Sequence, residues 1–342
     1  MKRLERLAKL GFAVVMAVLC WRPGRRRAAR SALAVARPRR VLVVRLDNRV
    51  GEALLTTPLL DALKAAGHEV HLLTHPKMRR VLEGHGALAR LWSWERPLGT
   101  LRALRAQRFE AVINCGNWAE PAVTSAVVAR LAGPAGVVLG PANFPSGWLM
   151  DVPVPPREGT TSEFVQRAQL GAALAPLPAP LRLSFRPTPP FVVVPGRYAV
   201  VNPGGRLGWR RVPTATFGLA ARALAARGVT PVVTWGPGEG PLADEVCAAC
   251  PQAVRAPATD LEQLASLVRA CGLTLCNNTG PMHLAVAVGC PTVALFLRMD
   301  VARWGHDYAP HQMVDLSQTD DVEGAVTRAL AALRLSSAAA PG

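Results

Sequence analysis

The sequence Asn-Asn-Thr-Gly at 277–280 is the first candidate for chemistry in this chain. It follows a short apolar run typical of a strand and precedes an apolar stretch of helical length, 281–288. Backbone N–H groups at a helix N-terminus attract phosphate, and Gly280 allows a close approach of the backbone. Thr279 can cap the helix or bind a phosphate through its hydroxyl. Thr279 and Gly280 alone fit a capped helix without a ligand as well as they fit a phosphate site. His283, which follows them, favours the phosphate site. A single His on an apolar helix is, however, more often a buried, hydrogen-bonded residue.

Two polar loops that contain glycine follow predicted strands and precede predicted helices. The first, 47–52, reads Asp-Asn-Arg-Val-Gly-Glu, and the second, 202–211, reads Asn-Pro-Gly-Gly-Arg-Leu-Gly-Trp-Arg-Arg. Neither matches the dinucleotide fingerprint or the Walker loop, so the motifs support neither a nicotinamide enzyme nor a simple ATP-hydrolysing enzyme. The pair Arg210 and Arg211 is either a solvated surface pair or a source of positive charge for a departing diphosphate. Its place directly after the second loop favours the functional interpretation.

The elements that must position these loops alternate between short strands and amphipathic helices. The predicted strands are 41–46, 70–73, 111–114, 137–139, 199–202, 231–234, 273–276 and 292–296. The predicted helices are 51–66, 76–84, 99–107, 119–131, 215–227, 241–249, 261–270 and 281–288. This alternation predicts parallel sheets covered by helices on both faces. A Pro-rich stretch, 174–195, separates two such series, so we expect two doubly wound domains with a ligand cleft at the carboxyl ends of their strands.

The histidines and cysteines do not form a persuasive metal site. His68 and His71 face opposite sides of a predicted strand. The cysteine pairs at 247/250 and 271/276 resemble a zinc pattern only loosely, and their places on a predicted helix and a buried strand favour core packing. Seven cysteines, an odd number, indicate a reducing compartment rather than a disulfide framework.

The positive charge of the chain is concentrated at its start. Hydrophobic residues make up 50% of the 342 residues and charged residues 18%, which excludes a disordered chain. The formal net charge is +17, and residues 1–40 contain 12 Lys and Arg against one Glu. A strongly basic N-terminal leader, followed by a remainder of the chain with a small net charge, indicates that the leader binds an anionic surface.

The leader also contains an apolar run, 10–21, which is too short to cross a bilayer as a helix. It can lie in the interface, with Trp21 at headgroup depth and the flanking arginines on anionic lipid. A signal peptide is the rival interpretation, but the arginines ahead of the small residues at 31–36 argue against cleavage. An exposed extension that touches nothing is the third. We expect residues 1–36 to associate with an anionic membrane and expect no nucleic-acid partner, because interleaved aromatic residues are missing.

Three stretches together resemble glycosyltransferase family 9, the ADP-heptose:lipopolysaccharide heptosyltransferases. They are 43–58, 202–213, and 277–285 followed by 289–296. They occur in the family's order and approximate spacing, and the resemblance covers about residues 40–335. It implies an α/β GT-B fold, in which two facing Rossmann-like, doubly wound domains have a cleft between them. The corresponding segments are a leader at 1–39, an acceptor-side domain at 40–185 and a nucleotide-sugar-binding domain at 186–342.

The resemblance also implies an inverting transfer that requires no metal or other cofactor. A heptose or related sugar passes from a nucleotide diphosphate sugar, expected to be ADP-heptose, to a lipid-linked glycan such as lipopolysaccharide core. The enzyme is expected to be cytoplasmic and peripheral on the inner face of the cytoplasmic membrane. The alternative is a catalytically silent family member that binds a nucleotide sugar or acts as a scaffold.

Two residues of this chain depart from the family's pattern at acidic positions. Glu52 follows the Gly of the first loop, where the family usually has Asp as general base. The other interpretation is an acid at the N-terminus of a helix, stabilised by the helix dipole. Asn278 replaces the usual Asp before Thr-Gly, and Arg210 aligns with the family's cation. By resemblance, 235–239 borders the nucleotide base. The residues expected to bind the donor are Asn202, Gly204, Gly205, Arg210, Arg211, Asn278, Thr279, Gly280 and His283, and the acceptor-side loop contributes Asp47, Asn48 and Gly51.

Overall fold

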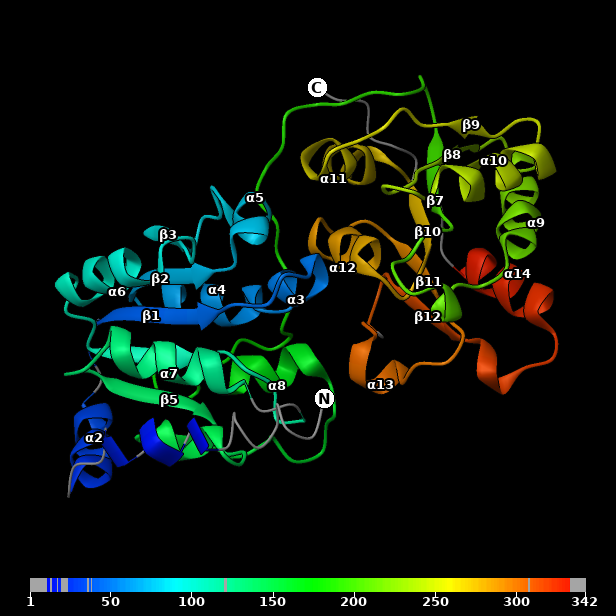
Figure 1. Ribbon diagram of the computed structural model, residues 1–342. Helices are drawn as coiled ribbons and strands as arrows, with labels where there is room; N and C mark the ends of the chain where they lie inside the picture. The colour runs from blue at the N-terminus through cyan, green and yellow to red at the C-terminus, as the bar shows by residue number, and fades with distance from the viewer. Residues whose placement is uncertain are drawn as a thin grey trace. The chain divides into compact units, whose positions relative to one another are not determined.

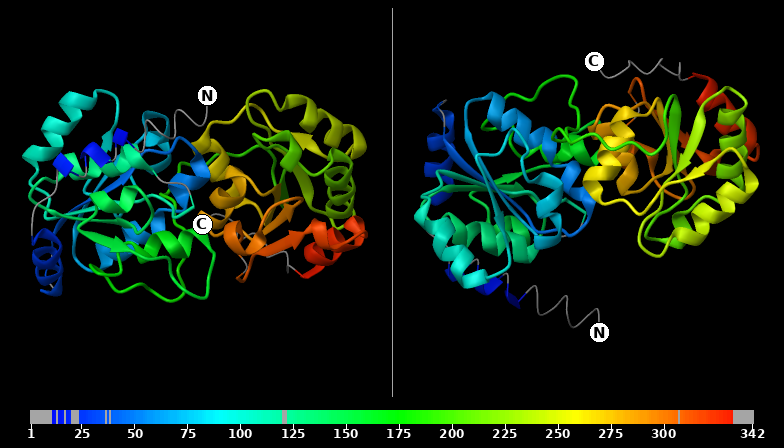
Figure 2. Two further views of the ribbon diagram at one scale, coloured as in Figure 1. Left: turned by 60° about the horizontal axis from the view of Figure 1, so that its bottom comes forward. Right: turned by 90° about the horizontal axis from the view of Figure 1, so that it is seen from above.

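The chain folds into two compact units, Met1–Arg182 and Leu183–Gly342, each built on one six-stranded parallel sheet (Figure 1). The structure is a computed structural model that describes residues 11–12, 14–16, 18–19, 24–35, 37, 39–119, 122–306 and 308–332. Helices cover both faces of each sheet (Figure 2). The sequence analysis predicts the domain boundary between residues 185 and 186. The structure divides the units between Arg182 and Leu183, in the same Pro-rich stretch.

The sheet of the first unit has the strand order β3-β2-β1-β4-β5-β6. Its strands are β1 (Arg40–Arg45), β2 (Glu69–Thr74), β3 (Arg90–Ser93), β4 (Ala111–Asn114), β5 (Val137–Pro141) and β6 (Val152–Val154). Its helices are α2 (Arg25–Ala34), α3 (Val50–Leu54), α4 (Thr57–Ala65), η1 (Pro76–Met78), α5 (Arg79–Leu82), α6 (Pro97–Ala106), α7 (Val123–Ala132), η2 (Ser146–Leu149) and α8 (Glu163–Gln169). The chain runs from β1 outward to β3 and then returns to β4 on the other side of β1. The order therefore reverses between β1 and β4, the place where such sheets bind ligands.

The sheet of the second unit has the order β12-β11-β10-β7-β8-β9 and reverses between β7 and β10. Its strands are β7 (Tyr198–Asn202), β8 (Thr230–Val233), β9 (Val254–Arg255), β10 (Leu273–Asn277), β11 (Thr292–Phe296) and β12 (Gln312–Asp315). Its helices are η3 (Gly208–Arg210), α9 (Thr214–Ala225), α10 (Gly240–Ala249), α11 (Leu261–Ala270), α12 (Gly280–Ala287), α13 (Val301–Trp304), η4 (Leu316–Gln318) and α14 (Val322–Ala332). Both sheets are doubly wound, and the predicted α/β class is confirmed.

The predicted helix 51–66 is wrong in one respect, because it is two helices, α3 and α4. Pro58 has no N–H to donate to the carbonyl of Leu54 and its ring crowds that carbonyl, so a continuous helix is interrupted there. The hydroxyls of Thr56 and Thr57 donate instead to the carbonyl oxygens of Glu52 and Leu54, at 3.0 and 2.8 Å. The predicted helix 76–84 is likewise shortened to η1 and α5.

The leader is joined to the first unit at α2. The Nε atom of Arg25 lies 2.7 Å from Oδ1 of the buried Asp151, and a guanidinium nitrogen of Arg39 donates to the carbonyl oxygens of Ala32 and Val35. Ahead of α2, the side chain of Met16 packs against the core of the unit. The basic residues at 1–10 and Trp21, on which part of the membrane prediction rests, lie outside the described residues. No helix among the described residues is long and apolar enough to span a bilayer.

Candidate functional site

A pocket of about 290 Å³ opens in the first unit where the strand order reverses between β1 and β4. Its floor is the carboxyl ends of these two strands, and its wall includes the start of α7. The residues that line it are Arg45, Leu46, Asp47, Arg49, Cys115, Gly116, Asn117, Ala122, Val123, Thr124 and Ser125. The pocket contains both charge and hydroxyl groups, which suits a hydrophilic ligand such as a sugar.

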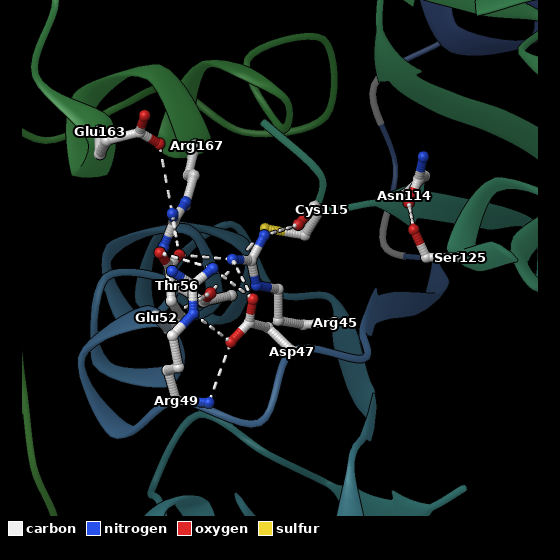
Figure 3. A network of polar contacts seen from close by, with 10 residues as sticks. All are labelled: Arg45, Asp47, Arg49, Glu52, Thr56, Asn114, Cys115, Ser125, Glu163 and Arg167. Atoms are coloured by element: carbon white, nitrogen blue, oxygen red, sulfur yellow. Dashed lines mark hydrogen bonds and ion pairs between the residues drawn. The ribbon is translucent and has the colours of Figure 1, made fainter. Parts of the chain in front are cut away.

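Glu52 lies beside this pocket in the first turn of α3 and is 4% exposed (Figure 3). Its Oε2 atom forms ion pairs with Arg45, from β1, and with Arg167, from α8. Its Oε1 atom lies 3.2 Å from Nη2 of Arg49. The backbone is held as well, because Nη1 of Arg167 donates to the carbonyl oxygen of Glu52 at 3.0 Å. The carboxylate thus joins three segments of the unit.

The charges around Glu52 decide its protonation state. Burial alone would raise the pKa of the Glu52 carboxyl, but the guanidinium charges of Arg167, Arg45 and Arg49 outweigh it and lower the pKa to about 2. Burial would lower the pKa of Arg167, and the negative charge of Glu52 raises it instead. Glu52 and Arg167 are therefore both charged at neutral pH.

Asp47 has a different environment, although it belongs to the same loop (Figure 3). Its side chain is 22% exposed and lines the pocket. Oδ1 accepts hydrogen bonds from the backbone N–H and Nε–H of Arg49, both at 2.9 Å, and Oδ2 accepts one from Nη2 at 2.6 Å. Burial would raise the pKa of Asp47, but the hydrogen bonds from Arg49 and the charge of Arg45 lower it. Asn48 lies in the same loop and is exposed, whereas Gly51 lies in the first turn of α3.

Sequence reasoning identified this loop but missed the arginines that organise it. Arg45 sits at the end of an otherwise apolar strand and donates from Nη1 to the carbonyl oxygen of Cys115 at 2.6 Å. A charged residue in a buried strand requires a counter-ion or a hydrogen-bond acceptor, so the sequence contains a signal that marks Arg45. Arg167 is fully buried on α8, a helix that the sequence analysis did not predict, and it pairs with Glu163 as well as Glu52. No local pattern marks it.

In the second unit, Asn277 holds the glycine-containing loop against the end of β10. Its Oδ1 atom accepts a hydrogen bond from the N–H of Val212 at 3.0 Å, and its Nδ2 donates to the carbonyl oxygens of Pro203 and Gly204 at 2.8 and 3.2 Å. Asn202 is buried at the end of β7, where its Nδ2 donates to Thr234. These amides fix the shape of the loop that follows β7.

Glu239, which follows β8, occupies backbone donors of the same region. Its carboxylate accepts from the N–H of Gly205 at 2.8 Å and from that of Gly236 at 3.0 Å, and it lies 3.6 Å from Nη2 of Arg211. A Cβ atom on Gly204 would lie 2.0 Å from Oε2 of Glu239. A side chain at 204 would therefore require the carboxylate of Glu239 to move away from the loop. Backbone N–H groups and an arginine thus surround an anionic group here.

The start of α12 adjoins this loop. A Cβ atom on Gly205 would lie 2.7 Å from Cγ2 of Thr279, so the two segments are in contact. Thr279 is the N-cap residue, yet its hydroxyl donates to the carbonyl oxygen of Asn277 at 3.3 Å and does not cap the helix. Asn278 is half-buried and follows β10, while Gly280 begins the helix. The predicted donor-site residues of the two motifs therefore gather at the carboxyl ends of β7 and β10.

The remaining predicted residues have more mixed positions. Arg210 is half-buried and its guanidinium carbon lies 4.5 Å from the ring centre of Trp209. His283 is buried, and its Nδ1 atom lies 2.8 Å from Nε2 of His306, so it has the paired, buried environment that a structural histidine has. Burial lowers the pKa of His306, and His283 and His311 lower it further, which keeps His306 neutral.

No group of His, Cys, Asp or Glu in the described part of the chain has the arrangement of a metal site. Cys250, Cys271 and Cys276 are buried, and Sγ of Cys271 lies 3.4 Å from Sγ of Cys290 within the core. These cysteines pack as the sequence analysis expects.

Residues 99–323 match the model of glycosyltransferase family 9 (heptosyltransferase). The chain belongs to this family. It is a heptosyltransferase-family glycosyltransferase, as its motifs predict. Among curated proteins, none matches the chain.

Solved structures of family 9 proteins share the fold. The ADP-heptose lipopolysaccharide heptosyltransferase II of E. coli is 19% identical, with a TM-score of 0.69 over 86% of this chain and 98% of that one. The E. coli heptosyltransferase WaaC with ADP-2-deoxy-2-fluoro heptose is also 19% identical, with a TM-score of 0.68 over 85% and 98%. A family 9 glycosyl transferase of Veillonella parvula is 17% identical, with a TM-score of 0.67 over 85% and 89%. The predicted GT-B architecture of two Rossmann-like domains is confirmed.

Proposed function

We propose that this glycosyltransferase moves a heptose from ADP-heptose to a lipid-linked glycan such as lipopolysaccharide core, with inversion at the anomeric carbon. The observation that carries the proposal is the meeting of three features at the carboxyl ends of β7, β8 and β10. These are the loop at 203–212, the backbone donors now held by Glu239, and the N-terminus of α12. Together they supply N–H groups, a helix dipole and arginine charge, which suit a diphosphate. The similarity to enzymes whose structures hold ADP or an ADP-heptose analogue supports adenosine as the nucleoside.

Positive charge for the departing diphosphate comes from Arg210 and Arg211 in this proposal. As the bond to the sugar breaks, negative charge develops on the diphosphate, and a nearby guanidinium stabilises that charge more than it stabilises the intact donor. Such stabilisation is the role that a divalent cation has in metal-dependent transfer, so we expect transfer to continue in the presence of a chelator. The resemblance assigns the general base to Glu52, which stays a prediction.

Donor binding can be measured without an acceptor. ADP at millimolar concentration is expected to raise the melting temperature by mass action, because it binds the folded protein alone. Arg210→Ala should reduce that rise. Arg222→Ala is the matched control, since it removes the same charge from the same unit but lies on α9, where it donates to the carbonyl of Ala249. An equal rise for both variants would contradict the placement of the diphosphate.

Transfer itself separates the enzyme from the silent alternative. The assay combines ADP-heptose with lipopolysaccharide whose core lacks heptose, and the product is identified by mass. Two observations favour the catalytically silent alternative: Glu52 is buried, and the neutral Asn278 replaces the family's usual Asp. A chain that binds ADP without forming product would support the silent alternative and contradict the proposed transfer.

We further propose that the leader places the enzyme on the inner face of the cytoplasmic membrane. Apolar side chains of the described leader residues are exposed, and arginines on α2 are exposed beside them in sequence. The apolar residues are Phe12, Val14, Val15, Val18 and Leu19, and the arginines are Arg26, Arg27 and Arg30. A surface that combines apolar and cationic groups suits anionic lipid.

A chain that begins at Gly24 should keep α2 and its ion pair with Asp151, and therefore stay folded. It is expected to lose binding to vesicles that contain anionic phospholipid, because the apolar residues are removed. Binding of the full chain should weaken in high salt, since screening shortens the reach of the arginine charges. Co-sedimentation with anionic and neutral vesicles measures both effects, and equal sedimentation of the two chains would contradict the membrane proposal.

A further inference from the structure

We propose that the exposed rings of Phe144 and Trp148 bind a sugar unit of the glycan acceptor, beside the pocket of the first unit. The inference rests on the proposed glycosyl transfer and extends it, because it concerns how the acceptor is held rather than how the new bond is made. Phe144 lies in the loop after β5, and Trp148 lies in η2. Both are binding residues and take no part in proton transfer.

The two rings form an exposed apolar patch. Phe144 is 58% exposed and Trp148 is 50% exposed. Their ring centres lie 5.0 Å apart with an angle of 87° between the planes, so the edge of one ring meets the face of the other. Aromatic residues make up only 5% of the chain, and their rings normally bury a large apolar area. Two such rings in contact at the surface indicate an interaction site.

The backbone that carries the rings is anchored in the unit. Residues 145–147, which lie between the two rings, are buried, and Leu149 is 2% exposed. The N–H of Gly147 donates to the carbonyl oxygen of Asn143 at 2.6 Å, and the carbonyl oxygen of Leu149 accepts a hydrogen bond from Nε of the buried Arg130 at 3.0 Å. The rings are therefore exposed on an ordered loop, and a ligand that binds them has little of the loop to order.

The same loop packs against the wall of the pocket. Strand β5, which precedes the loop, pairs in parallel with β4, whose carboxyl end forms part of the pocket floor. Nδ2 of Asn143 donates to the carbonyl oxygen of Asn117 at 2.9 Å, and a Cβ atom on Gly116 would lie 3.6 Å from Cγ of Pro141. Asn117 and Gly116 both line the pocket. A ligand that extends out of the pocket past this wall therefore meets the loop of the two rings.

The size of the pocket indicates what part of the acceptor reaches the rings. Its volume of about 290 Å³ is at the lower end of the range of about 300–1,000 Å³ that ligand pockets span, so it suits one sugar unit. The unit with the reacting hydroxyl occupies the pocket in this proposal, and the next unit of the glycan lies outside it. The acyl chains of a lipid-linked glycan are further away, because the sugars separate them from the reacting end.

A sugar ring also suits the chemistry of the patch. One face of a pyranose ring can present several C–H groups, which makes that face apolar although the edge of the ring carries hydroxyls. Such a face packs on an aromatic ring, because the negative face of the aromatic quadrupole attracts the weakly positive C–H hydrogens. The rings of Phe144 and Trp148 supply the apolar surface, and the polar pocket beside them supplies partners for hydroxyls.

Binding tests the inference without any transfer. The probe is the oligosaccharide that remains when the acyl chains are removed from heptose-deficient lipopolysaccharide, and calorimetric titration measures its affinity. We expect Trp148→Ala and Phe144→Ala each to weaken binding about tenfold, the usual scale for truncating an aromatic contact residue. Trp148→Phe should stay within about threefold of the unmodified chain, because it keeps a ring. Both alanine variants should keep the melting temperature and its rise with ADP, since the rings are exposed.

Leu98→Ala is the matched control, because Leu98 is another large apolar side chain of the first unit, on α6, and is 86% exposed. It should leave the affinity for the oligosaccharide unchanged. Unchanged affinity in both alanine variants, or an unmodified chain that does not bind the oligosaccharide, would overturn the inference.

Transfer shows which part of the acceptor the rings contact. Trp148→Ala should raise KM for the oligosaccharide about tenfold without a change in kcat. It should leave kcat/KM unchanged for the methyl glycoside of the terminal sugar, which ends at the pocket. Equal losses with both acceptors would mean that the rings act through the fold of the pocket, and a loss confined to acylated acceptor would assign them to the acyl chains; either result overturns the inference. If the unmodified chain binds ADP and forms no product, the proposed transfer fails, and the titration still decides whether the rings bind the glycan.

Discussion

Glu52→Gln is expected to lower the free energy of unfolding by about 3–5 kcal/mol, the usual effect of removing one partner of a buried ion pair. The variant keeps the size of the side chain and removes its charge. Arg45 and Arg167 then remain buried without the counter-ion that Oε2 of Glu52 supplies. Arg167 retains Glu163, at 3.2 Å, so the loss falls mainly on Arg45. Chemical denaturation followed by circular dichroism measures the change.

The matched control is Arg49→Gln, which removes the exposed partner of the same carboxylate. Its side chain is 43% exposed, so its loss should cost less than about 1 kcal/mol. A Glu52→Gln variant as stable as this control would show that the buried network does not stabilise the first unit.

The same network predicts how stability depends on pH. The pKa of Glu52 is lowered from 4.5 to about 2 in the folded protein. A lowered pKa means that the unfolded chain binds the proton first, so the stabilisation is complete above about pH 4.5 and is lost as the pH falls toward 2. Its size is about 3 kcal/mol from the shift of the pKa. Unfolding curves of Glu52→Gln should lack this part of the acid dependence.

Asp151→Asn is expected to have the second-largest effect, a loss of about 3 kcal/mol in the free energy of unfolding. Its buried carboxylate lies 2.9 Å from Nη2 of Arg130 and 2.7 Å from Nε of Arg25, and it accepts a hydrogen bond from the N–H of Val138 at 2.8 Å. Arg130 is buried as well, so it would lose its counter-ion. Loss of the contact to Arg25 should also release α2 from the first unit.

Trypsin reports on that release, because α2 contains Arg26, Arg27 and Arg30. Cleavage there should be faster in Asp151→Asn than in the unmodified chain, under conditions where both are folded. Arg25→Ala is the matched control: it frees α2 but leaves the pair of Arg130 and Asp151, so cleavage should rise while stability falls by less than about 1 kcal/mol. Unchanged cleavage in both variants would contradict the anchoring of the leader.

Local patterns in the sequence were enough to predict the four central strands of each sheet. The run Val41–Val44 consists only of Val and Leu. In the structure it forms the middle of β1 and is completely buried. The helix 261–270 and the strand 292–296 agree with α11 and β11 to the residue. The four edge strands β3, β6, β9 and β12 were not predicted, because their two to four residues are not the continuous apolar runs that mark the buried central strands. The prediction of one continuous helix over 51–66 is wrong because Pro58 interrupts it.

The sequence by itself determined the family, the strand–loop–helix order and the two loops that carry the candidate site. Only the tertiary structure decided which carboxylate faces the pocket. Arg167 reaches Glu52 across 115 positions of the chain, and Arg45 reaches the carbonyl of Cys115 across 70. Motif spacing encodes the conformation of neighbouring residues, whereas burial and ion pairing depend on which distant segments fold together. Glu52 and Asp47 are therefore two nearby acids in the sequence, but they differ in burial and in ion pairing in the folded protein.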